Sequence, residues 1–230
     1  MKAAQITRYS KNIRMTVNDI PVSEIGDDDI LIRVKAAAVN PVDILNLTGA
    51  VRLIQDYKMP LTLGNECAGI VEKAGRHVTR FQPGDRVYSR LPVSSLGAFA
   101  KCIAVPALAA ARMPEGLDSV TASAIPLTGL TVYQAIAEKL CAKPGETFSF
   151  PAVPAFVEKN SFPLIKRFPF TLAGAEYDRK AKRQAKAYRF LFVRADGAQL
   201  EKITRIVEAN HIVPKIDPRE SDLSQINDAL

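Results

Sequence analysis

The chain of 230 residues is poor in the side chains that hold metals and disulfides, with three cysteines and two histidines. Cys67, Cys102 and Cys141 are far apart, odd in number and without C-x-x-C spacing, which argues against a disulfide framework and favours a reducing compartment. Neither His77 nor His211 has a partner at metal-ligand spacing. We therefore expect no catalytic or structural metal.

Long apolar runs are also missing. No stretch approaches the roughly 18 apolar residues that span a bilayer, and the N-terminus, Met-Lys-Ala-Ala-Gln-Ile-Thr-Arg, has no apolar signal core. We predict no membrane partner and a cytoplasmic location. A hydrophobic content of 47% over this length is nonetheless enough for a sizeable folded core.

A third absence concerns glycine. A dinucleotide pyrophosphate normally binds backbone N–H groups at a helix N-terminus, in a turn with G-x-G-x-x-G spacing. No three of the 12 glycines have that spacing. After Thr147 the chain reads Phe-Ser-Phe-Pro-Ala-Val-Pro, and Pro151 and Pro154 argue against a buried parallel strand. The sequence therefore contains no standard cofactor cradle.

Positive charge is in excess, with a net charge of +7, and much of the excess is local. Residues 176–189 hold six Lys or Arg side chains against two acidic ones. A solvated helix face explains this cluster better than a nucleic-acid patch, because neither aromatic interleaving nor a nucleic-acid-binding motif accompanies it. A cofactor phosphate is a further alternative for the cluster. We predict no nucleic-acid partner.

Short β-prone runs separated by turn residues dominate the first part of the chain. The predicted strands are Lys2–Thr7, Ile13–Val17, Ile30–Val39, Cys67–Lys73, Arg86–Ser89 and Ala98–Val105. This spacing predicts a compact, partly closed β-barrel rather than alternating β–α units.

Helical patterning begins near Asp118, which with Ser119 fits an N-cap for a helix over Val120–Ile125. Pro126 fits the first turn of a second helix, which continues to Leu140. A later strand over Tyr188–Val193 and a helix over Gly197–Asn210 are predicted. One strand and one helix are too few for a doubly wound sheet, so the C-terminal third is typical of the remainder of a domain.

Five motifs occur in an order that resembles one family. They are Ala-Ala-Ala-Val-Asn-Pro-Val-Asp at 36–43, Leu-Gly-Asn-Glu-Cys-Ala-Gly-Ile-Val-Glu at 63–72, Phe-Gln-Pro-Gly-Asp-Arg-Val-Tyr at 81–88, Pro-Leu-Thr-Gly-Leu-Thr-Val-Tyr at 126–133 and Lys-Pro-Gly-Glu at 143–146. Together they resemble medium-chain dehydrogenases/reductases, and most closely the zinc-free quinone oxidoreductase-like branch. Residues 188–217 resemble the end of that family's nucleotide-binding domain and its return to the barrel.

The resemblance implies an α+β fold in three segments. Residues 1–147 would form a GroES-like, partly open β-barrel with helices. Residues 148–210 would be a truncated remnant, one strand and one helix, of an α/β Rossmann cofactor domain, and residues 211–230 would return to the barrel. The order of motifs breaks between Thr147 and Pro163. Two explanations of the break are open. Either the protein has a true deletion, or the sequence comes from an intact reductase and lacks a stretch of it, and we favour the second.

The resemblance also implies a function and a site. It implies NADPH as the cofactor and hydride transfer to a quinone or enone acceptor, a chemistry that the cofactor itself carries. Asn40, Pro41 and Val42 would lie beside the nicotinamide, with Thr128 and Thr131 in the same cleft. From the residues alone, Asn40 is equally well a turn residue before proline, and Thr128 a local hydrogen bonder at a helix start. No residue is assigned a catalytic role.

Two further expectations concern zinc and partners. The zinc-using branch of the family has a histidine where this chain has Asn65, and Cys67 is typical of a buried structural cysteine. The predicted strand Tyr188–Val193 is an aromatic-rich sheet edge, so a homodimer is predicted, although the chain's own barrel is an equal candidate to cover it. The alternative function is a cofactor-free, catalytically inactive GroES-like binding or scaffold module.

Overall fold

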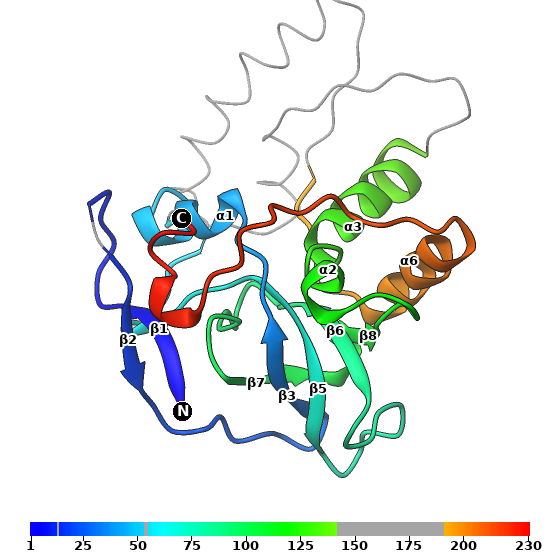
Figure 1. Ribbon diagram of the computed structural model, residues 1–230, viewed down its shortest axis with the longest axis horizontal. Coiled ribbons are helices and arrows are strands. Elements are labelled where there is room, and N and C mark those ends of the chain that lie inside the picture. The colour runs from blue at the N-terminus through cyan, green and yellow to red at the C-terminus, as the bar shows by residue number, and fades with distance from the viewer. Residues whose placement is uncertain (13, 53–54, 142–190) are drawn as a thin grey trace, which may run out of the picture. The chain divides into compact units, whose positions relative to one another are not determined.

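A computed structural model describes residues 1–12, 14–52, 55–141 and 191–230 (Figure 1). The chain forms two compact units, Met1–Leu130 with Arg194–Leu230, and Thr131–Val193. The predicted division into segments 1–147, 148–210 and 211–230 stays a prediction. The predicted break between Thr147 and Pro163, the Lys-Pro-Gly-Glu motif and the basic cluster at 176–189 all lie outside the described residues.

Two antiparallel sheets build the first unit. The smaller sheet has the order β2-β1-β4, formed by Thr16–Asp19, Lys2–Ile6 and Leu61–Thr62. The larger has the order β7-β3-β5-β6-β8, formed by Cys102–Pro106, Asp29–Ala36, Glu66–Ala74, Arg86–Arg90 and Ala110–Arg112. An isolated bridge joins Ala3 to Ala100. The predicted α+β class, with open sheets and helices, is confirmed.

The period of the strands decides which side chains form the core. Ile30 and Ile32 of β3 are buried with Val71 of β5 and Val87 of β6 in one apolar cluster. Gly69 allows β3 and β5 to approach at this point, since a Cβ there would lie 2.2 Å from the carbonyl oxygen of Arg33. Register shifts along the β3–β5 pair accompany this close contact.

The helices of the first unit lie at the ends of strands. The predicted helix after Asp118 is α2 (Ser119–Ser123), and the Asp118 side chain accepts the Thr121 N–H at 2.7 Å. Pro126 opens α3 (Pro126–Tyr133), which continues as a π-helical segment, η2 (Gln134–Leu140). Helix α1 (Pro41–Thr48) was not among the predicted elements, and Asn40, which the sequence also allowed as a turn residue before proline, is its N-cap. Proline at the first helical position fits because its missing N–H would have no intrahelical partner.

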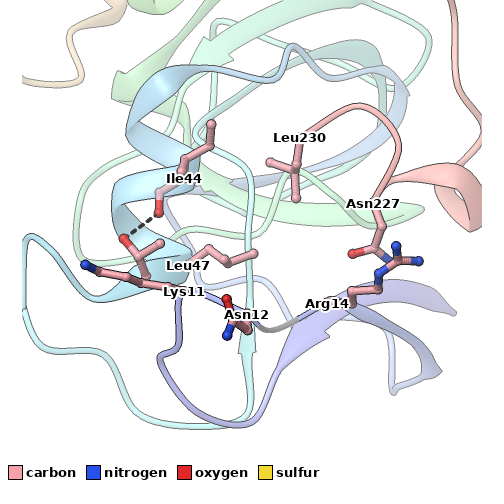
Figure 2. Close-up of a pocket in the computed structure, with 8 residues that line it drawn as sticks. Lys11, Asn12, Arg14, Ile44, Leu47, Asn227 and Leu230 are labelled. Atoms are coloured by element: carbon pink, nitrogen blue, oxygen red, sulfur yellow. Dashed lines mark hydrogen bonds between the residues drawn. The ribbon is translucent and has the colours of Figure 1, made fainter.

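The last residues return to the smaller sheet. After the short 3₁₀ turn η3 (Leu223–Gln225), Ile226 is buried in a second apolar cluster with Ala4 and Ile6 of β1. The Asn227 side chain accepts the Met15 N–H at 2.8 Å and donates to the Met15 carbonyl at 2.9 Å. Figure 2 shows Asn227 beside the segment that precedes β2. The return to the barrel predicted for residues 211–230 therefore ends on the first strands of the chain.

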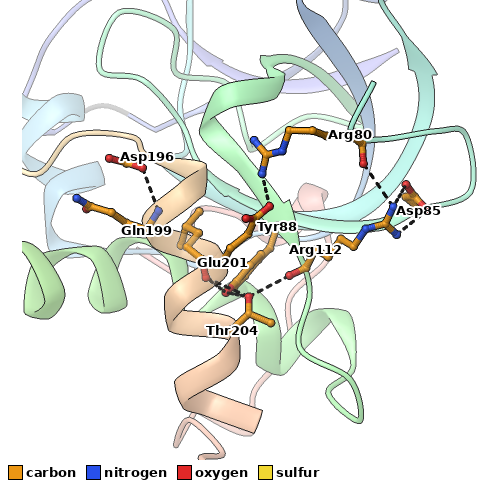
Figure 3. A network of polar contacts seen from close by, with 9 residues as sticks. Arg80, Asp85, Tyr88, Arg112, Asp196, Gln199, Glu201 and Thr204 are labelled. Carbon is orange, nitrogen blue, oxygen red and sulfur yellow. Dashed lines mark hydrogen bonds and ion pairs between the residues drawn. The ribbon is translucent and has the colours of Figure 1, made fainter. Parts of the chain in front are cut away.

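Helix α6 (Gly197–Ala209) confirms the predicted helix Gly197–Asn210, and it packs directly against the larger sheet. The Tyr88 hydroxyl of β6 shares a 2.8 Å hydrogen bond with Thr204 Oγ1 (Figure 3). Backbone carbonyls lie within reach of both hydroxyls, that of Leu200 at 3.2 Å from Tyr88 and that of Arg112 at 3.1 Å from Thr204. Arg80 forms an ion pair with Glu201. This helix therefore belongs to the same compact unit as the barrel.

The predicted strand Tyr188–Val193 is described only in part. Residues 191–193 lie in no strand, and residues 188–190 lie outside the described ranges. The described part therefore offers no sheet edge for the predicted homodimer, which stays a prediction.

Candidate functional site

Two motifs of the sequence meet at the carboxyl group of Glu66, the first residue of β5. Its side chain is completely buried. Asn40 Nδ2 donates to Oε1 at 2.7 Å, and the Leu127 backbone N–H donates to Oε2 at 2.6 Å. Because Asn40 is the N-cap of α1 and Leu127 lies in the first turn of α3, Glu66 ties the starts of both helices to one strand end.

A second buried carboxyl, that of Asp43, holds α1 from within. One of its oxygens accepts the Asn40 backbone N–H at 2.8 Å, and the other accepts Asn65 Nδ2 at 2.6 Å. Asn65 directly precedes Glu66, so consecutive residues of the same motif bind α1 at two points. The Asn40–Asp43 pair also satisfies an N–H group at the helix start.

Burial decides the electrostatics of the site. It raises the pKa of Glu66 to about 7 and that of Asp43 to about 6, because the charged forms lose their hydration, while the hydrogen bonds just described oppose the rise. Arg90 is paired in register with Glu66 across the β5–β6 ladder and is also buried. Desolvation lowers its pKa, and its Nε has no hydrogen-bond partner among the described residues. The site is therefore a buried polar cluster.

Four of the five predicted cofactor residues, all except Thr131, lie at the two helix starts. Asn40 and Val42 are half-buried, whereas Pro41 and Thr128 are exposed. Glu66 brings Asn40 and the first turn of α3, which contains Thr128, to a common anchor. Thr131 lies on α3 three residues after Thr128, at the start of the second unit.

The donors and acceptors fit only part of a nicotinamide cofactor. Both amide hydrogens of Asn40 are engaged, by Glu66 Oε1 and by the Ala38 carbonyl at 3.3 Å. Asn40 can therefore offer a carboxamide only its acceptor oxygen, while the exposed Thr128 hydroxyl can donate or accept. These groups suit an uncharged amide. A pyrophosphate needs several converging backbone N–H groups, and among the described residues no glycine-rich helix start supplies them.

Metal ligands do not gather in the described ranges, where no three His, Cys, Asp or Glu side chains are grouped to hold an ion. At the position where the zinc-using branch has histidine, Asn65 donates to Asp43. Cys67 is fully buried, and burial raises the pKa of its thiol to about 12. The absence of zinc from the protein stays a prediction.

Sequence analysis did not single out Glu66, Asp43 or Arg90. One signal in the sequence could have pointed to Glu66, a carboxylate at the start of an apolar strand. A carboxylate in such a position is rarely buried without a hydrogen-bond or ionic partner. The partner itself depends on where α1 and α3 begin, and α1 was not predicted.

No helix in the ranges that the structure describes is long and apolar enough to cross a membrane.

Comparisons with known proteins match one family model and several oxidoreductases. The alcohol dehydrogenase GroES-like domain matches residues 26–115. The quinone oxidoreductase of Lama guanicoe is 30% identical over 148 residues, which cover 64% of this chain and 44% of that protein. The mitochondrial NAD(P)H oxidoreductase RTN4IP1 of Mus musculus is 31% identical over 150 residues, covering 59% of this chain and 38% of that protein.

A solved structure shows the same relationship. The quinone oxidoreductase of Escherichia coli, crystallised with NADPH, is 27% identical with a TM-score of 0.57, and the match covers 64% of this chain and 43% of that one. The matched part of this chain thus spans less than half the length of each of these proteins.

Proposed function

Because this chain belongs to the medium-chain dehydrogenase/reductase superfamily, in its quinone oxidoreductase-like branch, we propose that it serves NADPH-dependent hydride transfer to a quinone or enone without zinc. The observation that carries the proposal is the Glu66 anchor, which brings together the Asn-Pro-Val-Asp and Pro-Leu-Thr-Gly motifs. NADPH would supply the hydride, and the protein would position the reacting groups.

The proposed cofactor residues are Asn40, Pro41, Val42, Thr128 and Thr131. The Asn40 oxygen would accept from the nicotinamide carboxamide, and the exposed Thr128 hydroxyl would bond the amide or the acceptor oxygen. Glu66 would fix both by holding the amide of Asn40 and the Leu127 N–H. Such positioning contributes to rate because reacting groups need a defined mutual geometry.

One observation favours a second candidate, a cofactor-free GroES-like binding module. The sequence has no G-x-G-x-x-G turn, so the pyrophosphate of NADPH lacks its usual cradle. The two candidates differ in whether the chain binds the cofactor at all.

A fluorescence titration of the purified chain with NADPH separates the candidates. The proposed function expects saturation at micromolar cofactor and NADPH oxidation that depends on an added quinone or enone and persists with a chelator present. Thr128→Ala should weaken cofactor binding, while Thr16→Ala, an exposed threonine on β2, should not. No saturation would leave the binding module ahead, and oxidation abolished by the chelator would contradict the zinc-free mechanism.

A cytoplasmic location and a homodimer remain part of the proposal. The relative from Mus musculus is a mitochondrial protein by its name, so fractionation of the source cell is needed to test location. Equilibrium sedimentation over a range of concentrations tests the dimer.

A further inference from the structure

Thr128 of α3 is exposed, and the residues on both sides of it are in contact with other parts of the first unit. On one side, the Leu127 N–H donates to Glu66 Oε2 at 2.6 Å. On the other side, Gly129 lies against Ile203 of α6. The first contact is polar and comes from the larger sheet, whereas the second is apolar and comes from a helix much later in the chain.

Gly129 allows α3 to come close to α6. A Cβ on this residue would lie 3.2 Å from Ile203 Cγ2 and 3.4 Å from Ile203 Cδ1. Both separations are shorter than the roughly 3.5–4.0 Å at which carbon atoms attract one another best. An added methyl group would therefore press on the isoleucine, and the close packing depends on the absence of a side chain.

The backbone conformation does not itself require glycine at position 129. Gly129 does not have a positive φ, and its N–H donates to the Ile125 carbonyl at 2.6 Å, in the pattern of a helix. Glycine inside a helix is less favourable than alanine, because it loses more conformational freedom on folding. The close approach of Ile203 is the structural feature that accounts for a glycine here.

Ile203 is in turn held in place by the larger sheet. Its side chain is buried, and the next residue, Thr204, shares the 2.8 Å hydrogen bond with the Tyr88 hydroxyl of β6 (Figure 3). At the start of the same helix, the Asp196 side chain accepts the Gln199 N–H at 3.0 Å. A close-packed interior transmits displacements, since it has few voids to absorb them. The position of α6 therefore affects the position of α3.

We propose that Ile203 is a positioning residue for the candidate site, because its contact with Gly129 determines where α3 places Thr128. Ile203 touches no reacting group and acts only through α3. What Thr128 binds rests on the proposed function, whereas the position of Thr128 does not. Since a hydrogen bond weakens steeply when its donor and acceptor are misaligned, a small displacement of α3 is enough to weaken a bond from Thr128 to the cofactor.

Two readouts at a fixed pH test the proposal. The amide resonance of Leu127 in nuclear magnetic resonance spectra reports the position of α3 without any cofactor, because its proton lies in the hydrogen bond to Glu66. The fluorescence titration with NADPH reports the effect on binding. Ile203→Ala should shift the Leu127 resonance and weaken NADPH binding at least about fivefold. Ile203→Val, which keeps Cγ2, should stay within about twofold of the parent.

A double variant separates the fit of the two helices from their stability. Gly129→Ala should shift the Leu127 resonance and weaken NADPH binding about fivefold, although alanine favours the helix. Ile203→Ala removes the carbon atoms that the new Cβ would meet. The double variant Gly129→Ala/Ile203→Ala should therefore return toward the parent in both readouts, and additive losses would overturn the proposal. If Ile203→Ala does not fold, Gly129→Ala alone still tests the contact.

Two further isoleucine variants serve as controls. Ile206→Ala changes a side chain of α6 that is 46% exposed, and Ile226→Ala removes a buried side chain from the apolar cluster of the smaller sheet. Neither should move the Leu127 resonance or the NADPH affinity, although Ile226→Ala should lower thermal stability. An equal shift of the resonance in Ile226→Ala would show that Ile203 acts only on stability.

The outcomes distinguish this inference from the proposed function. An unmoved Leu127 resonance in both Ile203→Ala and Gly129→Ala would refute the positioning role, and so would an NADPH affinity that stays at the parent's value while the resonance shifts. If the parent does not bind NADPH, the proposed function fails, and the Leu127 resonance still decides whether Ile203 positions α3.

Discussion

Glu66 and Asp43 have ionisable side chains that are buried, so their titration affects the free energy of unfolding. The pKa of Glu66 rises from the ordinary 4.5 to about 7, and that of Asp43 from 3.8 to about 6, chiefly through desolvation. A carboxyl whose pKa is higher in the folded state holds its proton there while the unfolded chain releases it. Unfolding free energy should therefore fall as pH rises through these windows.

We expect stability to fall between about pH 5 and pH 7.5, on the order of 2 kcal/mol in total for Glu66. Glu66→Gln, which cannot ionise, should flatten the decline, and Asp43→Asn should flatten its part below about pH 6. Urea unfolding at a series of pH values measures this. A decline of equal slope in Glu66→Gln would show that another group is responsible.

Removing the anchor itself should cost more than neutralising it. Glu66→Ala leaves Asn40 Nδ2 and the Leu127 N–H without their acceptor, so we expect a loss of about 3 kcal/mol in unfolding free energy. Glu66→Gln keeps a carbonyl oxygen for one of the two donors and should lose about 1 kcal/mol. Urea unfolding below pH 5 compares them. Equal losses would indicate that only side-chain volume matters here.

Site residues could be predicted from the sequence where they belong to motifs that resemble those of the family. Asn40 and Thr128 were selected as site residues, and Glu66 does connect the helix starts that hold them. Glu66 and Arg90 were missed because they meet through pairing across β5 and β6, and hydrophobic periodicity says nothing about such a pair.

At the scale of elements, the contact between α6 and β8 depends on one residue without a side chain. A Cβ on Gly197 would lie 2.2 Å from the Ala110 carbonyl and 2.8 Å from that of Leu108, both backbone atoms that cannot rotate away. We expect Gly197→Ala to lower the unfolding free energy by about 2 kcal/mol, because α6 must shift off the sheet.

The exposed neighbour Ala198 supplies the control. Ala198→Ser should change the unfolding free energy by less than about 0.5 kcal/mol, since it makes no such approach. Thermal unfolding of both variants checks this pair. A Gly197→Ala variant as stable as the parent would mean that α6 docks more loosely than described.

Most elements of the barrel were predictable because their turns and alternation are strong. The sequence predicted β1, β3, β5 and β6 to within a few residues, and the Asp118 cap of α2. It missed β4 and β8, which have two and three residues, too few to show a period. It missed α1 because an Asn-Pro pair is equally typical of a turn, and the bond from Asp43 that favours the helix is a matter of local geometry.

At the scale of the whole molecule, the metal content distinguishes the branches of the superfamily. We expect less than one equivalent of zinc per chain, because the described residues group no three His, Cys, Asp or Glu side chains around a common point and Asn65 donates to Asp43. Elemental analysis of protein purified without chelators measures it. One tightly held equivalent would contradict the expectation and reopen the assignment to the zinc-free branch.

The surface on which α6 packs was not predictable from the sequence. The resemblance places α6 in a remnant of the cofactor domain, a division that stays a prediction, and in the structure α6 contacts β8 and binds β6 through Tyr88 and Thr204. These two residues are 116 positions apart. The hydrophobic period of a segment predicts a helix, but it does not predict which part of the protein the helix will pack against.

The packing of residues 226 and 227 on the first strands affects how the protein folds during synthesis. Ile226 packs with Ala4 and Ile6, and Asn227 binds Met15 across 212 positions. During synthesis the first strands leave the ribosome long before Ile226 and Asn227 have been made. Until then, the apolar side chains of the smaller sheet that contact Ile226 remain uncovered. Closure of the barrel is therefore a late event, and until then the nascent chain presents an apolar surface of the kind that chaperones bind.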